Sequence, residues 1–267
     1  MRGFRKKCVV VTGGASGIGL AVSRRFAQAG ARMALLDADA DGLRAAEKAL
    51  LASGHDAWGF PCDVSQENQC TAAMEAILDR YEGIDVLVNN AGITQRGAFV
   101  DTRTEVFERV MQVNFFGTLY CTKAAINSLI QRQGMIIVNE SIAALTPLLG
   151  RTGYSASKHA LHGLFSSLRS ELHGTGVHVM IVCPGFVRTN LQTRALGCDG
   201  EITTHPQSSV GTHQTPDQVA EAIYQGALKQ KRLLVLTPVG KASYWVHRFF
   251  PGIYEQIMRR QLRDELT

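Results

Sequence analysis

The fold of this chain is best predicted from one segment, Cys8-Val9-Val10-Val11-Thr12-Gly13-Gly14-Ala15-Ser16-Gly17-Ile18-Gly19. It begins as a short β-branched apolar run, which is typical of a buried strand in a parallel sheet. The run ends in glycines, and from Gly17 onward apolar residues recur with helical spacing up to Gly30. A strand, a glycine turn and a helix in this order predict the first unit of a βαβ fold.

The same alternation continues along the chain. Apolar runs predict strands over 8–12, 32–36, 56–61, 84–88, 135–138, 177–182 and 233–236. Helical spacing and capping residues predict helices over 17–29, 39–51, 66–81, 104–130, 155–172 and 215–229. Buried strands separated by helices need right-handed crossovers, so we expect a doubly wound (Rossmann) α/β fold with a seven-stranded parallel sheet covered on both faces.

Composition excludes several other classes of protein. The chain has 267 residues, of which 45% are apolar and 19% are charged, as in globular proteins, and its 26 glycines follow no collagen-like period. No apolar run approaches the ~18 residues of a membrane span. We predict one Rossmann-fold domain over 1–240, with 241–267 as a C-terminal amphipathic helical extension of that domain.

Charge and cysteine give weaker indications. The formal net charge is +5, and seven basic residues precede the first acid, Asp37. This basic N-terminal end suits an anionic ligand or is a solvated surface. We expect no nucleic-acid partner, because no basic stripe with interleaved aromatics is found. The six cysteines form no C-x-x-C pair and no zinc-ligand spacing, so we expect free thiols, no metal and a cytoplasmic location. No apolar segment follows the basic start, which argues against a signal peptide.

The glycine turn predicts a binding site for a dinucleotide. Glycines let the backbone approach a pyrophosphate, and the free N–H groups of the helix start face its negative charge. We expect contacts from Gly13, Ser16, Gly17, Ile18 and Gly19.

Asp37 ends the second predicted strand, where a carboxylate can accept hydrogen bonds from the ribose of NAD and would repel the extra phosphate of NADP. No Lys or Arg occupies 37–43, so we expect NAD, with NADP less favoured. The alternative for Asp37 is an ordinary helix-capping acid. Asp63 and Val64, after the third strand, are expected at the adenine, although a plain turn aspartate also explains Asp63.

Three polar side chains point to proton transfer. Tyr154 and Lys158 are four residues apart at a helix start and share one face, and Ser141 follows the fifth strand. A free tyrosine titrates near ~10, and a nearby ammonium lowers that pKa. Tyr154 is therefore the expected acid and base for a carbonyl or alcohol oxygen, with Ser141 polarising that oxygen and Lys158 also holding a ribose. Asn114 either supports a water that carries protons to Lys158 or is a satisfied core asparagine.

With these residues together, the sequence resembles the short-chain dehydrogenase/reductase family over about residues 7–237. Thr12-Gly13-x-x-x-Gly17-x-Gly19 matches the family's cofactor turn, and Asn114, Ser141, Tyr154 and Lys158 match its catalytic tetrad. The resemblance implies that Asn90, Ala91 and Gly92 border the cofactor. It also implies that Pro184 and Gly185 follow strand six, with Val187 and Thr189 holding the carboxamide. Glu140 departs from the family pattern and is either a surface residue or a group that tunes the site.

The predicted function is hydride transfer between a nicotinamide cofactor and a small-molecule secondary alcohol or ketone. Leu145, Leu148, Leu149 and Phe186 favour an apolar substrate, such as a lipid, steroid-like or aromatic carbonyl, although core packing also explains them. The alternative is a non-catalytic sensor of NAD(H). The segment 192–213 lacks periodicity and is expected to be a loop.

The extension over 241–267 should form two short helices interrupted at Pro251-Gly252. It can cover the substrate pocket or an oligomer interface, lie on a membrane surface through its aromatics and arginines, or complete the core; the membrane is not favoured. The resemblance implies a homodimer or homotetramer through helices 104–130 and 155–172.

Overall fold

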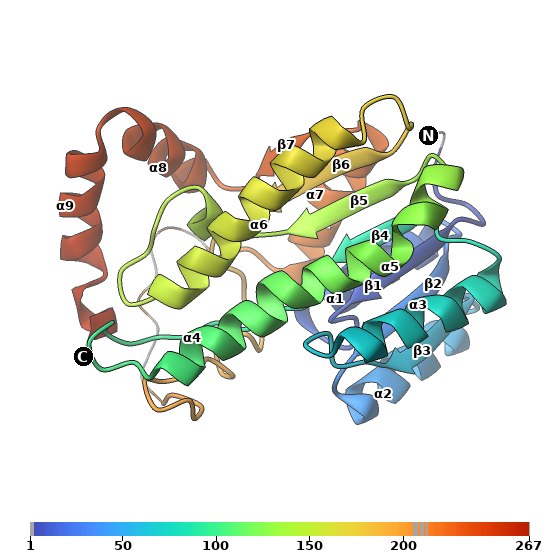
Figure 1. The fold of residues 1–267 in the computed structure, drawn as a ribbon, viewed down its shortest axis with the longest axis horizontal. Helices are drawn as coiled ribbons and strands as arrows, with labels where there is room; N and C mark the ends of the chain where they lie inside the picture. Colours follow the sequence, from blue (N-terminus) through green and yellow to red (C-terminus); the bar gives the residue numbers. More distant parts are fainter. Residues whose placement is uncertain (1–2, 205–207, 209–210, 212, 267) are drawn as a thin grey trace.

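A sheet of seven parallel strands runs through the centre of the computed structural model, which describes residues 3–204, 208, 211 and 213–266 (Figure 1). The strands are β1 (Cys8–Thr12), β2 (Arg32–Asp37), β3 (Ala57–Pro61), β4 (Val86–Asn89), β5 (Met135–Asn139), β6 (His178–Cys183) and β7 (Leu233–Val235). Their order is β3-β2-β1-β4-β5-β6-β7. The order reverses between β1 and β4, and the predicted doubly wound parallel sheet is confirmed.

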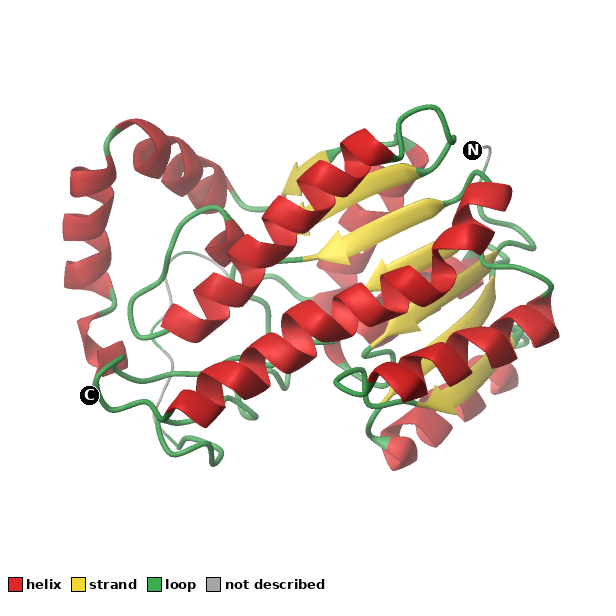
Figure 2. Cartoon of the chain, in the orientation of Figure 1, coloured by secondary structure: helices red, strands yellow, loops and turns green. Residues whose placement is uncertain are grey.

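Helices cover both faces of the sheet (Figure 2). Successive side chains of a strand point to opposite faces, so Val9 and Val11 pack into one core and Val10 into the other. The first core lies under α1 (Gly17–Gln28), α2 (Ala40–Ala52) and α7 (Pro216–Leu228). The second lies under α3 (Glu67–Tyr81), α5 (Gly117–Gln131) and α6 (Thr152–Glu171).

The chain is helical over the predicted range 104–130, but the helix contains a π turn that the sequence did not predict. The structure has α4 (Thr104–Met111), a π-helical turn over Gln112–Phe116 and then α5. A π turn accommodates one extra residue per turn, and such turns are frequent at functional sites. Here it contains Asn114, whose side chain is fully buried. At Gly117, directly after the turn, a Cβ would lie 2.7 Å from Val64 Cγ2, so the helix passes very close to the segment after β3.

Two helix starts position groups that matter for the site. Helix α6 begins at Thr152, earlier than predicted, so Tyr154 lies in its first turn. Helix α2 begins after Asp39, whose side chain accepts from the Gly42 N–H at 3.0 Å. The predicted capping box at Thr215 and Gln218 is present at the start of α7.

The C-terminal region folds as two short helices, α8 (Pro238–Phe249) and α9 (Pro251–Gln261), followed by a 3₁₀ turn over Arg263–Leu266. As predicted, Pro251 separates the two helices. They lie beyond the carboxyl ends of the strands (Figure 1). Several large apolar side chains here are exposed: Trp245, Phe249, Phe250, Ile253 and Ile257. Within the residues that the structure describes, no helix is long and apolar enough to cross a membrane.

Candidate active site

A cavity of about 540 Å³ opens at the carboxyl ends of the strands. Nearly all residues predicted from the sequence line it: Gly13, Ser16, Gly17, Ile18, Asp37, Asp63, Val64, Asn90, Ala91, Gly92, Ser141, Tyr154, Lys158, Pro184, Gly185, Val187 and Thr189. Two predicted residues, Gly19 and Asn114, do not line it.

The glycine turn presents backbone to the cavity. Gly13 and Gly17 have φ of +65° and +53°, in the left-handed region that side chains disfavour. A Cβ at Gly17 would contact the Thr189 side chain at 3.4 Å, so it would occupy the space between the turn and the loop after β6. Among the described residues, no side chain caps the start of α1, so its first N–H groups remain available for an anion. This cradle fits a dinucleotide pyrophosphate.

Gly19, for which a cofactor contact is predicted, does not line the cavity and is closely packed. It is buried, and a Cβ there would lie 2.0 Å from the Gly13 carbonyl oxygen and 2.6 Å from Asn90 Nδ2. The absence of a side chain at this position lets α1 lie directly against the turn. Asn90 reinforces the same region, because its Nδ2 donates to the Thr12 and Gly13 carbonyl oxygens at 3.0 and 3.2 Å.

Asp37 orders the turn and also faces the cavity. Its Oδ2 accepts from the Ala15 N–H at 2.9 Å and its Oδ1 from the Asp39 N–H at 3.0 Å. The capping alternative is wrong for α2, since Asp39 is the N-cap residue. Each carboxylate oxygen keeps a second lone pair with which it can accept a ribose hydroxyl.

A cation that the sequence did not indicate also lines this end of the cavity. Arg194, from the segment after β6, lies with its Nη2 3.7 Å from Asp39 Oδ2. The residues 37–43 give no sign of this cation, because Arg194 is more than 150 positions away in the sequence.

Tyr154, Ser141 and Lys158 meet at the other end of the cavity. Ser141 and Tyr154 both line this end, and the Ser141 side chain is close enough to the Tyr154 hydroxyl to act on its pKa. Lys158 Nζ donates to the Asn139 carbonyl oxygen at 3.1 Å and lies 5.7 Å from the centroid of the Tyr154 ring. The backbone of Tyr154 is held in place by Gln95, whose Oε1 accepts from its N–H at 2.9 Å. The predicted trio is therefore assembled around one point.

Burial is the largest influence on the pKa values of Tyr154 and Lys158. It raises the pKa of Tyr154 above its ordinary value, while the Ser141 side chain and the charge of Arg151 act to lower that pKa. Burial also lowers the pKa of Lys158 to about 8, and the charge of Glu140 opposes this shift. Arg151, a cavity residue that the sequence interpretation did not include, therefore adds a charge that acts to lower the pKa of Tyr154.

Asn114 has the environment of a satisfied core asparagine. Its Oδ1 accepts from the Ile93 N–H at 2.8 Å, and its Nδ2 donates to the Ile93 carbonyl oxygen at 3.0 Å and to Ser157 Oγ at 2.9 Å. Only Gly92 separates it from the lysine, because a Cβ at Gly92 would lie 3.0 Å from Asn114 Oδ1 and 3.7 Å from Lys158 Nζ. Asn114 therefore fixes the backbone beside the cavity.

Glu140 is not a surface residue, so that interpretation is wrong. Its side chain is fully buried and lines the cavity directly before Ser141. His162 Nδ1 lies 3.0 Å from Glu140 Oε2.

The substrate end of the cavity has mixed walls. Leu148 and Phe186 line it as predicted, whereas Leu145 packs into the core beneath α6 and Leu149 does not line the cavity. Arg151 and Gln192 add polar groups. The predicted loop over 192–213 is described only in part, and its residues 205–207, 209–210 and 212 lie outside the described residues.

Comparison with known proteins agrees with this geometry. Residues 7–196 match the profile of the short chain dehydrogenase family. Dehydrogenase/reductase SDR family member 7B of Bos taurus is 34% identical over 274 residues, which cover 99% of this chain and 84% of that protein. The SDR family protein 7-like of Drosophila melanogaster is 31% identical over 261 residues, which cover 96% of this chain and 80% of that protein.

Solved structures show the same fold. A short chain dehydrogenase/reductase from Burkholderia phymatum, in complex with NAD, superposes with a TM-score of 0.84 at 24% identity, over 96% of this chain and 97% of that one. An alcohol dehydrogenase from the archaeon Thermococcus sibiricus, complexed with 5-hydroxy-NADP, gives 0.74 at 26% identity, over 86% of this chain and 94% of that one. The chain belongs to the short-chain dehydrogenase/reductase family of oxidoreductases.

Proposed function

We propose that this chain is an NAD-dependent alcohol dehydrogenase or ketoreductase acting on a secondary alcohol or ketone. The observation that carries the proposal is that Ser141, Tyr154 and Lys158 line one cavity, with Lys158 Nζ 5.7 Å from the centroid of the Tyr154 ring. This places a proton donor and a polarising hydroxyl at one point, as carbonyl reduction requires.

Different residues along the cavity bind different parts of the cofactor. The glycine turn holds the pyrophosphate, Asp37 the adenosine ribose and Lys158 the nicotinamide ribose, with Thr189 at the carboxamide. When bound, the nicotinamide ring supplies the carbon that accepts or gives hydride. Tyr154 then gives its hydroxyl proton to a carbonyl oxygen, or removes the proton of an alcohol, while Ser141 donates a hydrogen bond to that oxygen. The ammonium of Lys158 favours the phenolate form of Tyr154.

The preference for NAD rests on Asp37. Its carboxylate lines the cavity, accepts hydrogen bonds from the Ala15 and Asp39 N–H groups, and is placed to repel a ribose phosphate. Arg194 does not reverse this preference, because its guanidinium faces the carboxylate of Asp39.

We also propose a substrate that is apolar near the reacting carbon, since Leu148 and Phe186 line the substrate end of the cavity.

The test is NADH absorbance during incubation of the purified chain with a panel of apolar secondary alcohols and ketones. Replacing Tyr154 with Phe removes the proton donor and keeps the ring, so turnover should fall by about 10²–10⁴-fold. Binding of NADH, followed by fluorescence, should change little. If NADH binds and no member of the panel is turned over, the result contradicts the dehydrogenase proposal and favours the non-catalytic sensor of NAD(H).

We further propose that the chain forms a homodimer or homotetramer through α5 and α6. Two large apolar side chains on this side, Phe116 and Ile130, are each 37% exposed in the single chain, which supports a covering partner. Light scattering coupled to size-exclusion chromatography should give twice or four times the mass of the chain, and a monomer at micromolar concentration contradicts the proposal.

A further inference from the structure

A buried carboxylate lies behind the catalytic lysine. Glu140 follows the last residue of β5, and its N–H donates to the Val182 carbonyl oxygen at 2.8 Å, which fixes it against β6. Its side chain is fully buried. A carboxylate is rarely buried without a partner, because desolvation of its charge is costly. A specific reason for this charge at the cavity wall is therefore expected.

The partner of Glu140 is a histidine that reaches solvent. His162 Nδ1 lies 3.0 Å from Glu140 Oε2, and the His162 side chain is 32% exposed. Because a carboxylate only accepts, Nδ1 carries the hydrogen of this bond. Cys183 Sγ, on β6, lies 3.9 Å from the same oxygen. The other carboxylate oxygen, Oε1, is buried and has no hydrogen-bond partner among the described residues.

Lys158 is a buried cation on the same helix as His162. It lies one helical turn before His162 on α6, so the two side chains project from the same face. Its Nζ donates to the carbonyl oxygen of Asn139, the residue directly before Glu140. The Lys158 side chain is buried, and the carboxylate of Glu140 acts to raise its pKa.

We propose that Glu140 is a positioning residue for Lys158: His162 keeps the buried carboxylate charged, and that carboxylate keeps the lysine ammonium charged. This deepens the proposed function, since the charged ammonium is the form that favours the Tyr154 phenolate. The pair acts through Lys158 and touches neither the substrate oxygen nor the cofactor in this mechanism.

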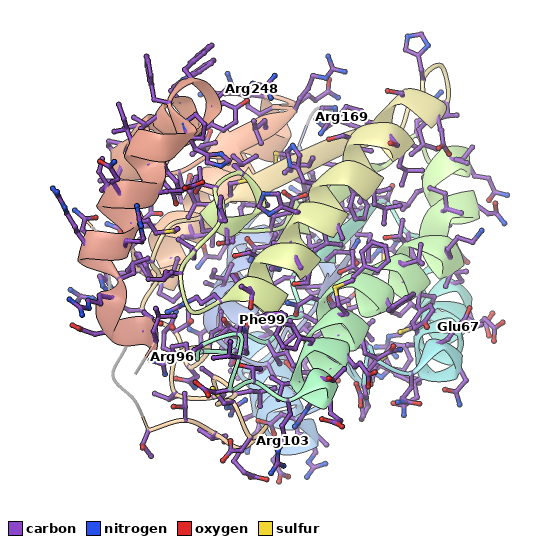
Figure 3. The ribbon with its side chains drawn as sticks, turned by 60° about the vertical axis from the view of Figure 1, so that its left-hand side comes forward. Glu67, Arg96, Phe99, Arg103, Arg169 and Arg248 are labelled. Carbon is purple, nitrogen blue, oxygen red and sulfur yellow. The ribbon has the colours of Figure 1, made fainter. Side chains whose placement is uncertain are left out.

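The titrating groups around the pair agree in direction. Burial raises the pKa of Glu140, and His162, Lys158 and Arg169 all act to lower it. Arg169 lies further along α6 (Figure 3), with its Nε donating to the Val179 carbonyl oxygen at 3.1 Å. The Cys183 thiol stays protonated, because burial and the charge of Glu140 raise its pKa. For Lys158, burial lowers the pKa to about 8 and Glu140 opposes that fall.

Loss of either Glu140 or His162 is expected to lower the pKa of Lys158. Without the Glu140 charge, the pKa of Lys158 falls further, so the amine loses its proton at a lower pH. Without His162, the pKa of Glu140 rises, so the carboxylate is neutralised at higher pH and supports the ammonium less. Glu140→Gln should therefore have the larger effect and His162→Asn a smaller one in the same direction.

The experiment is a pH titration of the Lys158 amine in the full chain by NMR, with ¹³C at lysine Cε and the signal assigned by its loss in Lys158→Met. The wild-type midpoint is expected near 8. Glu140→Gln should lower it by about one pH unit or more, as removal of a close opposite charge does. The matched control is His159→Gln, because His159 is on the same helix but bonds to the Ser155 carbonyl oxygen.

The outcomes separate the two proposals. Circular dichroism and thermal unfolding establish that each variant is folded, and the titration needs no turnover. A Lys158 midpoint that stays within error of wild type in folded Glu140→Gln overturns the inference, even if the chain is an active dehydrogenase. A lowered midpoint in a chain that turns over no alcohol supports the inference and overturns the proposed function alone. If Glu140→Gln does not fold, His162→Asn decides by the same criterion.

Discussion

The two ends of the cavity are built in different ways. At the dinucleotide end (Gly13, Gly17, Gly19 and Asp37), backbone groups of one strand-turn-helix unit form the site, and the Asp37 side chain joins it from 22 residues away. At the substrate end, Glu140, Arg151 and Tyr154 line the cavity, and ion pairs from other segments hold the first two of them. Arg151 and Glu265, for example, are 114 residues apart. The first end therefore depends on local backbone shape, and the second on charge pairs that only the whole fold assembles.

The C-terminal segment belongs to the substrate end. Glu265 is almost fully buried, and its Oε2 lies 3.3 Å from Arg151 Nη2. Gly150 accommodates this approach, because a Cβ there would lie 2.6 Å from the Glu265 carbonyl oxygen. In α9, the Tyr254 hydroxyl donates to the Pro147 carbonyl oxygen at 2.8 Å. These contacts hold the segment before α6, and with it the start of the catalytic helix.

The largest expected effect on stability is at this end. Glu265→Gln leaves the Arg151 guanidinium buried without its countercharge, which should lower the free energy of unfolding by about 3–5 kcal/mol. Urea denaturation at neutral pH measures this. The control is Asp41→Asn, which breaks an exposed ion pair with Arg44 and should change stability little. Equal effects of the two variants would show that the buried pair does not anchor the C-terminal segment.

A smaller effect is expected at the dinucleotide end. Gly19→Ala places a Cβ 2.0 Å from the Gly13 carbonyl oxygen, so α1 must shift away from the turn. We expect a loss of about 1–3 kcal/mol in stability and weaker dinucleotide binding.

The matched control is Gly163→Ala, in the middle of α6, where an added Cβ has nothing within 4 Å. This change should raise stability by about 0.5–1 kcal/mol, because alanine is the better helix former. Thermal unfolding of both variants gives the comparison. A Gly19→Ala protein as stable as Gly163→Ala is incompatible with the close packing described for the turn.

The smallest expected effect concerns cofactor choice. Asp37→Asn removes the negative charge but keeps the shape, so the ratio of kcat/KM for NAD over that for NADP should fall by about tenfold, equivalent to ~1.4 kcal/mol. Steady-state kinetics with both dinucleotides measures the ratio, with Asp41→Asn as the surface control. A wild-type chain that prefers NADP would show that Asp37 does not select the cofactor.

The parallel sheet, the glycine turn and the candidate site residues Tyr154, Lys158 and Ser141 could all be predicted from the sequence. These follow from short-range signals: strand and helix periodicity, glycines at a turn, and two side chains one helical turn apart. Such signals need no knowledge of where distant segments lie.

The other features of the site could not be predicted from the sequence, because they depend on the tertiary structure. It turned Glu140 inward onto His162, brought Arg194 to Asp39 and Glu265 to Arg151, and placed a π turn around Asn114. Each of these depends on which segments the fold packs together. A charged side chain is buried only when the free energy gained from its partners offsets the cost of removing it from water. Both terms depend on which segments surround the side chain in the folded protein.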